Sequence, residues 1–423
     1  MSFPRYQEYK DSGVGWLGEV PNDWELKRLR YVTTLLTDKS EECENAIGLE
    51  NIEGWTGRFI STDTEFERVG VDFEAGDILF GKLRPYLAKV WLAEFAGKAV
   101  GDFHVMRPSP DICGRYVIYQ MLNRDFISIV DGSTFGARMP RVSWDFMANM
   151  LLPVPTPHEQ HAIVSFLDRE TSEDDSLAAE QRRLIELLKE KRQAVISHAV
   201  AKGLNPNASM KPSGIQWLGD VPEHWSPMKI KYLFQYAKRQ NYPDETVLSV
   251  YRDYGVIEKS TRDDNFNKTP VDLTAYQLVE SGDLVINKMK AWQGSLGISK
   301  LRGITSPDYV VYRSINAEYL PYLHQLLRSK QMASLYHSLS NGVRPAQWRV
   351  ETDKFEQIIL YLPPLGEQED ISQFIESQLK EFDNLSTEAE RAIELLQERR
   401  TALISAAVTG KIDVREFAYQ ETA

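Results

Sequence analysis

Two short segments of the chain place a Glu-x-x-Asp pair shortly before a lysine. Their members are Glu74, Asp77 and Lys82 in the first half, and Glu280, Asp283 and Lys288 in the second. Carboxylates of this kind could hold the divalent metal ion of a nuclease. In both copies, however, a Gly-Asp pair opens an apolar run, and an Asp in that place usually closes a turn. We therefore expect turns here and keep a metal-dependent nuclease as an alternative.

Other patterns that could serve catalysis or cofactor binding are weaker. Residues 13–18 have the letters Gly-x-Gly-x-x-Gly, but no strand precedes them and Pro21 follows where a dinucleotide-binding fold needs a long helix. His158 and His161 could share one helix face, but no third metal ligand is evident. The sequence has no phosphate-cradling Gly-x4-Gly-Lys-Ser/Thr loop and no glycine loop with the Asn/Asp-Pro-Pro-aromatic clamp of an adenine methyltransferase. We expect no catalytic residue, no metal and no cofactor on this chain.

Basic and polar clusters on glycine-containing loops remain as the candidate site. The DNA-binding candidates are Lys82, Arg84, Lys89, Arg138 and Arg141 in the first half, and Lys238, Arg239, Lys288, Lys290, Arg344, Gln347 and Arg349 in the second. Lys and Arg neutralise phosphates, and Arg and Gln can make bidentate contacts to purine edges in the major groove. One such cluster alone would be ordinary charged surface. Corresponding clusters at corresponding places in both halves favour a nucleic-acid interface.

The first half of the chain returns as the second half. Residues 12–24 read Ser-Gly-x-x-Trp-Leu-Gly-Glu-Val-Pro-x-x-Trp, and residues 213–225 repeat them with Asp for Glu, a shift of 201 residues. Residues 184–188 and 194–200 correspond to 392–396 and 402–408 at a shift of 208. The stretches between these blocks agree only faintly. A duplicated frame that carries two different modules is typical of a recognition protein.

A long helix should follow each module. Each module ends in a Pro-rich stop followed by Glu-Gln, and residues 158–202 and 366–409 then lack internal Pro and, after Gly366, Gly. Apolar residues in these segments alternate three and four apart, which predicts a coiled-coil seam interrupted by polar residues. We expect the two helices to pack antiparallel on each other. The apolar residues outside the seam either pack on the modules or dock other subunits; they are Ile185, Leu187, Ile393 and Leu395.

Composition and charge restrict the class of protein. The net charge is −12, but residues 226–361 are net +4, residues 25–150 net −4 and residues 362–423 net −7, so much of the acidity lies in the helical frame. Cys43 and Cys113 are too few for a disulfide framework or a zinc site, and a reducing cytoplasm is expected. No apolar run is long enough to cross a membrane. Short apolar runs broken by Gly, Asp and Pro predict mixed α/β modules.

The order of these parts resembles the specificity subunit of Type I restriction–modification systems. The expected parts are an arm (1–24), a target recognition domain (25–152), a spacer helix (153–203), a linker with the repeated arm (204–225), a second target recognition domain (226–361), a second spacer helix (362–410) and a tail (411–423). The fold class is then α+β, with two mixed α/β target recognition domains held apart by two long antiparallel coiled-coil helices in a pseudo-twofold repeat.

The resemblance also implies a function. The chain would have no catalytic activity and would read a bipartite, asymmetric sequence in double-stranded DNA. It would join two modification (methyltransferase) subunits and two restriction/translocase subunits, which would carry S-adenosylmethionine, ATP and Mg. A helical scaffold that organises a complex without touching DNA is the other alternative.

Overall fold

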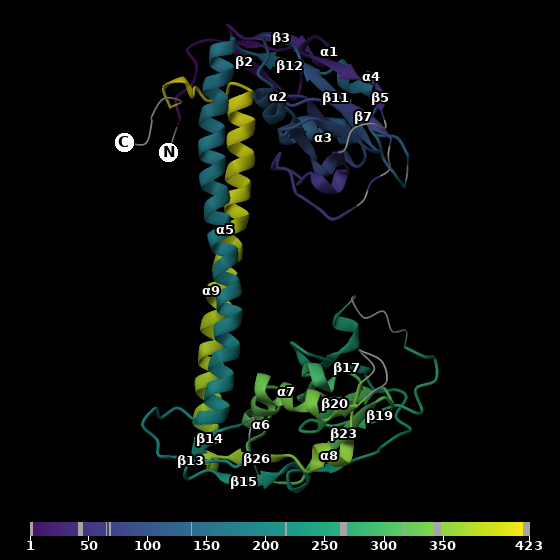
Figure 1. Cartoon of the computed structure of the whole chain (residues 1–423), viewed down its shortest axis with the longest axis vertical. Coiled ribbons are helices and arrows are strands. Elements are labelled where there is room, and N and C mark those ends of the chain that lie inside the picture. Colours follow the sequence, from purple (N-terminus) through teal and green to yellow (C-terminus); the bar gives the residue numbers. More distant parts are fainter. Residues whose placement is uncertain are drawn as a thin grey trace. The chain divides into compact units, whose positions relative to one another are not determined.

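The computed structural model describes residues 3–40, 45–64, 66, 69–136, 138–215, 218–262, 269–316, 318–341 and 348–417. The chain forms two compact units, which we call unit 1 (Met1–Arg182 with Glu390–Ala423) and unit 2 (Arg183–Ala389). Each unit contains one mixed α/β module and one part of each long helix, α5 (Pro157–Lys202) and α9 (Leu365–Val408) (Figure 1). The predicted fold class is confirmed. No helix in these ranges is long and apolar enough to span a membrane.

Unit 1 contains two four-stranded sheets. The first has the order β4 (Thr33–Leu36), β11 (Phe103–Pro108), β8 (Ile78–Gly81) and β9 (Val90–Leu92), all antiparallel. The second has the order β5 (Lys39–Ser40), β7 (Gly70–Phe73), β10 (Gly97–Ala99) and β6 (Ala46–Ile47), with β10 and β6 parallel. Two strand pairs complete the unit: β1 (Tyr9–Asp11) with β2 (Glu19–Pro21), and β3 (Glu25–Arg28) with β12 (Leu151–Val154).

The alternation of side chains along β8 explains why this strand is apolar throughout. Ile78 and Phe80 face the core built with α2 (Gly114–Met121) and α3 (Arg124–Gly132), whereas Leu79 faces a second core with Trp91. A strand buried on both faces reads as a continuous apolar run, because neither set of side chains meets water. The short helices α1 (Leu29–Val32) and α4 (Trp144–Ala148) flank the module.

Unit 2 repeats this plan with different strands around it. Its central antiparallel sheet has the order β16 (Phe234–Tyr236), β23 (Tyr309–Ser314), β20 (Leu284–Asn287) and β21 (Leu296–Ile298). Its helices are α6 (Leu320–Leu327), α7 (Lys330–Ser338) and α8 (Thr352–Glu356). The remaining strands form antiparallel pairs: β13 (Met210–Pro212) with β14 (Asp220–Pro222), β15 (Ser226–Lys229) with β26 (Ile359–Leu362), β17 (Leu248–Tyr251) with β18 (Gly255–Glu258), β19 (Gln277–Val279) with β22 (Gly303–Thr305), and β24 (Ser340–Asn341) with β25 (Arg349–Val350).

The repeated Glu-Gln joins each module to the start of its long helix. Gln160 accepts a hydrogen bond from the Cys113 amide at 2.8 Å and donates to the Pro155 carbonyl at 3.0 Å. In unit 2, Gln368 accepts from the Tyr319 amide at 3.1 Å and donates to the Pro363 carbonyl at 2.9 Å. Both glutamine side chains are buried, so each joins the Pro-rich stop to the backbone just before a helix of its module, α2 in unit 1 and α6 in unit 2.

The long helices lie side by side and antiparallel, as predicted (Figure 1). In unit 1 the beginning of α5 meets the end of α9, where Asp174 pairs with Arg399. In unit 2 the end of α5 meets the beginning of α9, where the Lys191 ammonium lies 5.5 Å from the centre of the Phe382 ring. The two contacts occupy equivalent positions of the repeat. Asp174 and Lys191, two polar interruptions of the seam on α5, therefore have partners across it.

Candidate nucleic-acid interface

In unit 1, two loops meet at the end of β8. We call residues 82–89 the exit loop and residues 134–142 the closing loop. The Lys82 amide donates to the Asp102 carbonyl at 2.9 Å, and the Val142 amide donates to the Lys82 carbonyl at 3.1 Å. The Arg84 amide donates to the Pro140 carbonyl at 2.8 Å. This pairing brings four predicted site residues together: Lys82, Arg84, Arg138 and Arg141.

These four cations are not equivalent. Arg141 makes a bidentate ion pair with Asp102, with Nε–Oδ1 and Nη2–Oδ2 distances of 2.8 Å. The carboxylate raises the pKa of Arg141, so this guanidinium stays charged and holds the closing loop against the first residues of β11. Arg84 and Arg138 are exposed, and no ion pair joins either of them to another described residue. Arg84 and Arg138 are therefore exposed cations that a phosphate or a base edge could reach, and Lys82 is half-buried beside them.

A buried histidine on β11 supports the closing loop. His104 on β11 donates from Nε2 to the Val142 carbonyl at 3.1 Å, and its ring lies 5.9 Å from the Trp144 ring, centre to centre. Burial lowers the pKa of His104 to about 4, so the imidazole is neutral at physiological pH. Asp102 and His104 were missed in the sequence because each lies outside the basic clusters.

Large apolar side chains stand among the exposed cations. Tyr86 in the exit loop and Phe135 and Met139 in the closing loop are all exposed, Phe135 at 63%. The basic clusters directed attention to Arg and Lys, so the adjacent Phe135 was not singled out.

Unit 2 has corresponding segments, residues 288–295 after β20 and residues 340–350 before α8, of which 340–341 and 348–350 are described. The Val350 amide donates to the Lys288 carbonyl at 3.2 Å, as Val142 does to Lys82. Arg349 is exposed and lies 3.0 Å from the Met289 sulfur, and Lys290 is exposed. Arg344 and Gln347 lie outside the described residues. The structure thus brings Lys288, Lys290 and Arg349 together.

Three aromatic rings pack beside the unit 2 loops. Trp292 lies 5.9 Å from Trp348 and 5.7 Å from His337, and His337 lies 4.7 Å from Trp348, measured between ring centroids. Arg349 directly follows Trp348, so these rings support the backbone that presents it.

Neither loop of either unit contains a carboxylate in its sequence, so the only formal charges on the four segments are positive.

The other predicted residues lie elsewhere or are engaged. The Lys89 ammonium donates to the carbonyls of Leu49 and Ile52 at 2.6 and 2.9 Å, and burial lowers its pKa. The Arg239 guanidinium pairs with Asp283, which precedes β20, whereas Lys288 follows β20 at its other end. Lys238 is exposed beside Arg239. The sequence grouped these cations with the site. Lys89 ends the exit loop but its ammonium is bound to backbone carbonyls, and Lys238 and Arg239 lie outside the loop pairs.

The repeated Glu-x-x-Asp pairs form turns. The Asp77 carboxylate accepts the Glu74 amide at 2.8 Å, and the Asp283 carboxylate accepts the Glu280 amide at 2.8 Å. Arg107 on β11 pairs with both acids in unit 1, and Arg239 does so in unit 2. Within the described residues no group of His, Cys, Asp or Glu is arranged to hold a metal ion. Carboxylates saturated by arginine and backbone amides do not favour the nuclease alternative.

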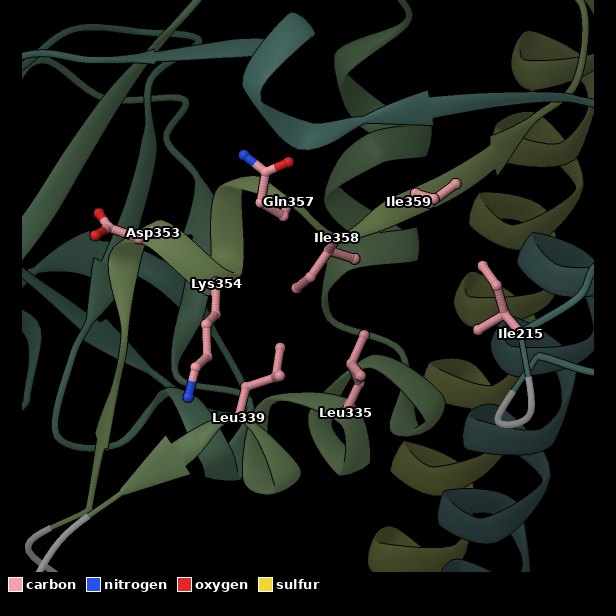
Figure 2. A pocket seen from close by; sticks show the side chains of 8 residues that line it. All are labelled: Ile215, Leu335, Leu339, Asp353, Lys354, Gln357, Ile358 and Ile359. Carbon is pink, nitrogen blue, oxygen red and sulfur yellow. The ribbon is translucent and has the colours of Figure 1, made fainter.

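An apolar cavity of about 470 Å³ lies in unit 2. Ile215 and Ile358 line it together with Leu335 and Leu339, and Figure 2 shows these two leucines pointing toward Ile358. Lys354 is its one lysine. None of the predicted DNA-binding residues lines this cavity.

Comparison with known proteins shows which proteins the chain resembles. Residues 222–395 match the Type I restriction modification DNA specificity domain. The chain is 23% identical to the specificity subunit of the Type I restriction enzyme MjaVIII from Methanocaldococcus jannaschii, over 99% of both chains. It is 20% identical to the EcoKI specificity subunit of Escherichia coli, over 93% of this chain and 90% of that one.

Solved structures share the fold. A chain from a type I R-M system studied for complex assembly and conformational transition has a TM-score of 0.67 at 15% identity, covering 92% of this chain and 98% of that chain. The HsdS subunit from Thermoanaerobacter tengcongensis has a TM-score of 0.54 at 16% identity, covering 93% and 98%. The chain is thus similar over nearly its whole length to Type I restriction–modification specificity subunits, and residues 222–395 match their DNA specificity domain.

Proposed function

We propose that this chain is the DNA-reading subunit of a Type I restriction–modification complex and that it recognises a split, asymmetric target. The observation that carries this proposal is the repeated loop pair. Each unit presents exposed cations on two carboxylate-free loops at the end of its central strand, but the two units differ in the residues presented. Two different readers on one duplicated frame suit two different half-sites.

The loop residues divide into two roles. Exposed Arg84, Arg138 and Arg349 can make bidentate contacts to guanine or neutralise phosphates, whereas Lys290 acts as a point charge on phosphate. Arg141, bound to Asp102, keeps the loop in place and leaves base contacts to its neighbours. Unit 1 reads one half-site and unit 2 the other.

The chain itself carries no catalytic step. We propose that two modification subunits supply S-adenosylmethionine and two restriction/translocase subunits supply ATP and Mg, while this chain binds no cofactor. The long helices offer a repeated docking feature for the modification subunits, because Leu187 of α5 and Leu395 of α9 are both exposed at equivalent positions. Exposed leucines on a helix face favour the docking alternative over packing on the modules. The cytoplasm is the expected location.

Sequencing of modified bases across the host genome, with and without the gene, tests this function. Deletion should remove one split, adenine-methylated motif, and exchange of residues 25–152 should alter one half of that motif only. If every methylated motif survives deletion in a host that expresses the complex, the scaffold alternative replaces the proposal.

A matched pair of lysines tests the location of the interface. Lys290 follows β20, and Lys300 follows β21 at the opposite end of the same strand pair; both are exposed. In the assembled complex, Lys290→Ala should reduce the salt dependence of DNA binding by about one phosphate contact and weaken all sequences alike. Lys300→Ala should leave binding unchanged. Equal effects of the two variants would place the DNA elsewhere on unit 2.

A further inference from the structure

Phe135 is an exposed aromatic residue on a fixed part of the closing loop. Its amide donates to the Arg141 carbonyl at 3.2 Å, and the Arg141 amide donates back to the Phe135 carbonyl at 3.1 Å. On the preceding side, Thr134 Oγ1 donates to the Asp131 carbonyl at 2.8 Å, at the end of α3. The backbone of Phe135 is therefore held on both sides while 63% of the residue is exposed.

The backbone directly after Phe135 requires a glycine. Gly136 has a φ of +97°, a conformation that residues with a side chain rarely adopt, and a Cβ there would lie 3.1 Å from the Met139 carbonyl oxygen. Arg141, bound to Asp102, anchors the end of the closing loop that follows this glycine. An exposed phenylalanine on such a support loses little conformational freedom when it binds.

The surroundings of Phe135 indicate what it binds. Arg138 is exposed three residues further along the same loop, and exposed Arg84 is joined through its amide to Pro140 of that loop. Exposed Met139 and Tyr86 extend the apolar surface. Proteins that kink DNA insert an apolar side chain between two base pairs. Cations beside this side chain hold the phosphates on either side of the kink.

We infer that Phe135 is a wedge that inserts between adjacent base pairs in or beside the half-site read by unit 1 and bends the DNA there. This inference rests on the proposed function and adds a mode of recognition to it. A base step that unstacks easily, such as TA or CA, would be favoured at that position without being contacted by a hydrogen bond. The wedge would also strain the duplex beside the adenine that a partner subunit must extract.

The test uses the subunit assembled with its modification subunits and duplexes that carry 2-aminopurine at successive positions of the unit 1 half-site. Apart from the adenine that the partner subunit extracts, fluorescence with the wild-type chain should rise at one step, because unstacking relieves quenching of the probe. Phe135→Ala should abolish this rise and weaken specific binding by roughly 5- to 150-fold, the range for a lost stacking contact. Phe135→Leu should retain much of the signal, because leucine also serves as a wedge.

Tyr31 provides the matched control. It is 67% exposed, but it precedes β4 at the end of the sheet opposite Gly81 and Lys82. Tyr31→Ala should leave the fluorescence unchanged. A wild-type complex that prefers its target but shows no unstacked step overturns the wedge alone, whereas a complex with no sequence preference overturns the proposed function.

Two other results would also overturn the wedge. If Phe135→Ala binds as tightly as wild type but no longer distinguishes thymine from uracil, the ring contacts a thymine methyl group instead. If the variant folds but no longer assembles with the modification subunits, the ring belongs to a protein interface.

Discussion

Replacement of Arg400 by methionine should loosen the attachment of the unit 1 module to its helices. Arg400 on α9 is only 10% exposed and donates to the Asp175 carboxylate at 2.6 Å. It also donates to the carbonyls of Thr171 and Thr56 at 3.4 and 3.2 Å. Arg58, from the same loop as Thr56, pairs with Asp175 at 2.6 Å. One guanidinium thus joins α9, α5 and a loop of the module.

The magnitude follows from burial. Removing one partner of a buried ion pair costs about 3–5 kcal/mol. Asp175 is 21% exposed and keeps Arg58, so the loss should be smaller, about 2–3 kcal/mol including the two unsatisfied carbonyls. Methionine retains an unbranched apolar side chain with good helix propensity, so the change isolates the polar contacts.

The repeat supplies a matched control. Arg192 occupies the equivalent position on α5 in unit 2, where it pairs with Asp383. That pair is open to solvent, with side chains 31% and 64% exposed, so Arg192→Met should cost about 0–1 kcal/mol. In thermal unfolding the Arg400 variant should lose roughly 4–12 °C in Tm, given about 2–4 °C per kcal/mol for a unit of this size.

Hydrogen exchange locates the effect. Peptides that cover residues 53–58 should exchange faster in Arg400→Met and at the wild-type rate in Arg192→Met. Equal losses of stability in the two variants, or unchanged protection of residues 53–58, would refute the view that burial makes the Arg400 contacts a structural tie.

Two further predictions concern His104 and Asp102, the residues that hold the closing loop of unit 1. His104 has a folded-state pKa of about 4 against an ordinary value of 6.5, so the unfolded chain binds the additional proton between these pH values. The free energy of unfolding of unit 1 should therefore fall by about 3 kcal/mol as the pH drops from 6.5 to 4, and His104→Gln should flatten that part of the profile. Asp102→Asn should cost about 1 kcal/mol in stability, because the bidentate pair with Arg141 is partly exposed, and should speed hydrogen exchange in residues 134–142. Protection equal to wild type in that segment would show that Arg141 does not hold the loop.

Much of the fold could be predicted because its signals are local or repeated. Heptad spacing without internal Pro specifies a long helix wherever it occurs, and the same pattern in two places predicts that the helices pack on each other. The repeated Glu-Gln was visible in the sequence, but its role was not. Only the structure brings the amides of Cys113 and Tyr319 to Gln160 and Gln368.

The candidate site was less predictable because the availability of a cation depends on distant partners. Lys89, Arg141 and Arg239 all belong to basic clusters in the sequence, yet each is bound to carbonyls or carboxylates that the fold supplies. The internal repeat does not make these partners predictable. The same Glu-x-x-Asp turn takes its arginine from β11 in unit 1 and from the segment after β16 in unit 2.

Net charge is therefore a poor guide to which module can bind DNA. The net charge of −4 over residues 25–150 does not say where the charges lie, and the pairs Asp77–Arg107 and Asp102–Arg141 each add zero to it. A compact ion pair has little field beyond about 10 Å at ordinary salt, whereas an unpaired cation on an exposed loop acts directly on the phosphate beside it. Where the two loops meet, unit 1 presents Arg84 and Arg138 and no free carboxylate in either loop. Under the proposed function, this edge is where the module can bind DNA in spite of its net negative charge.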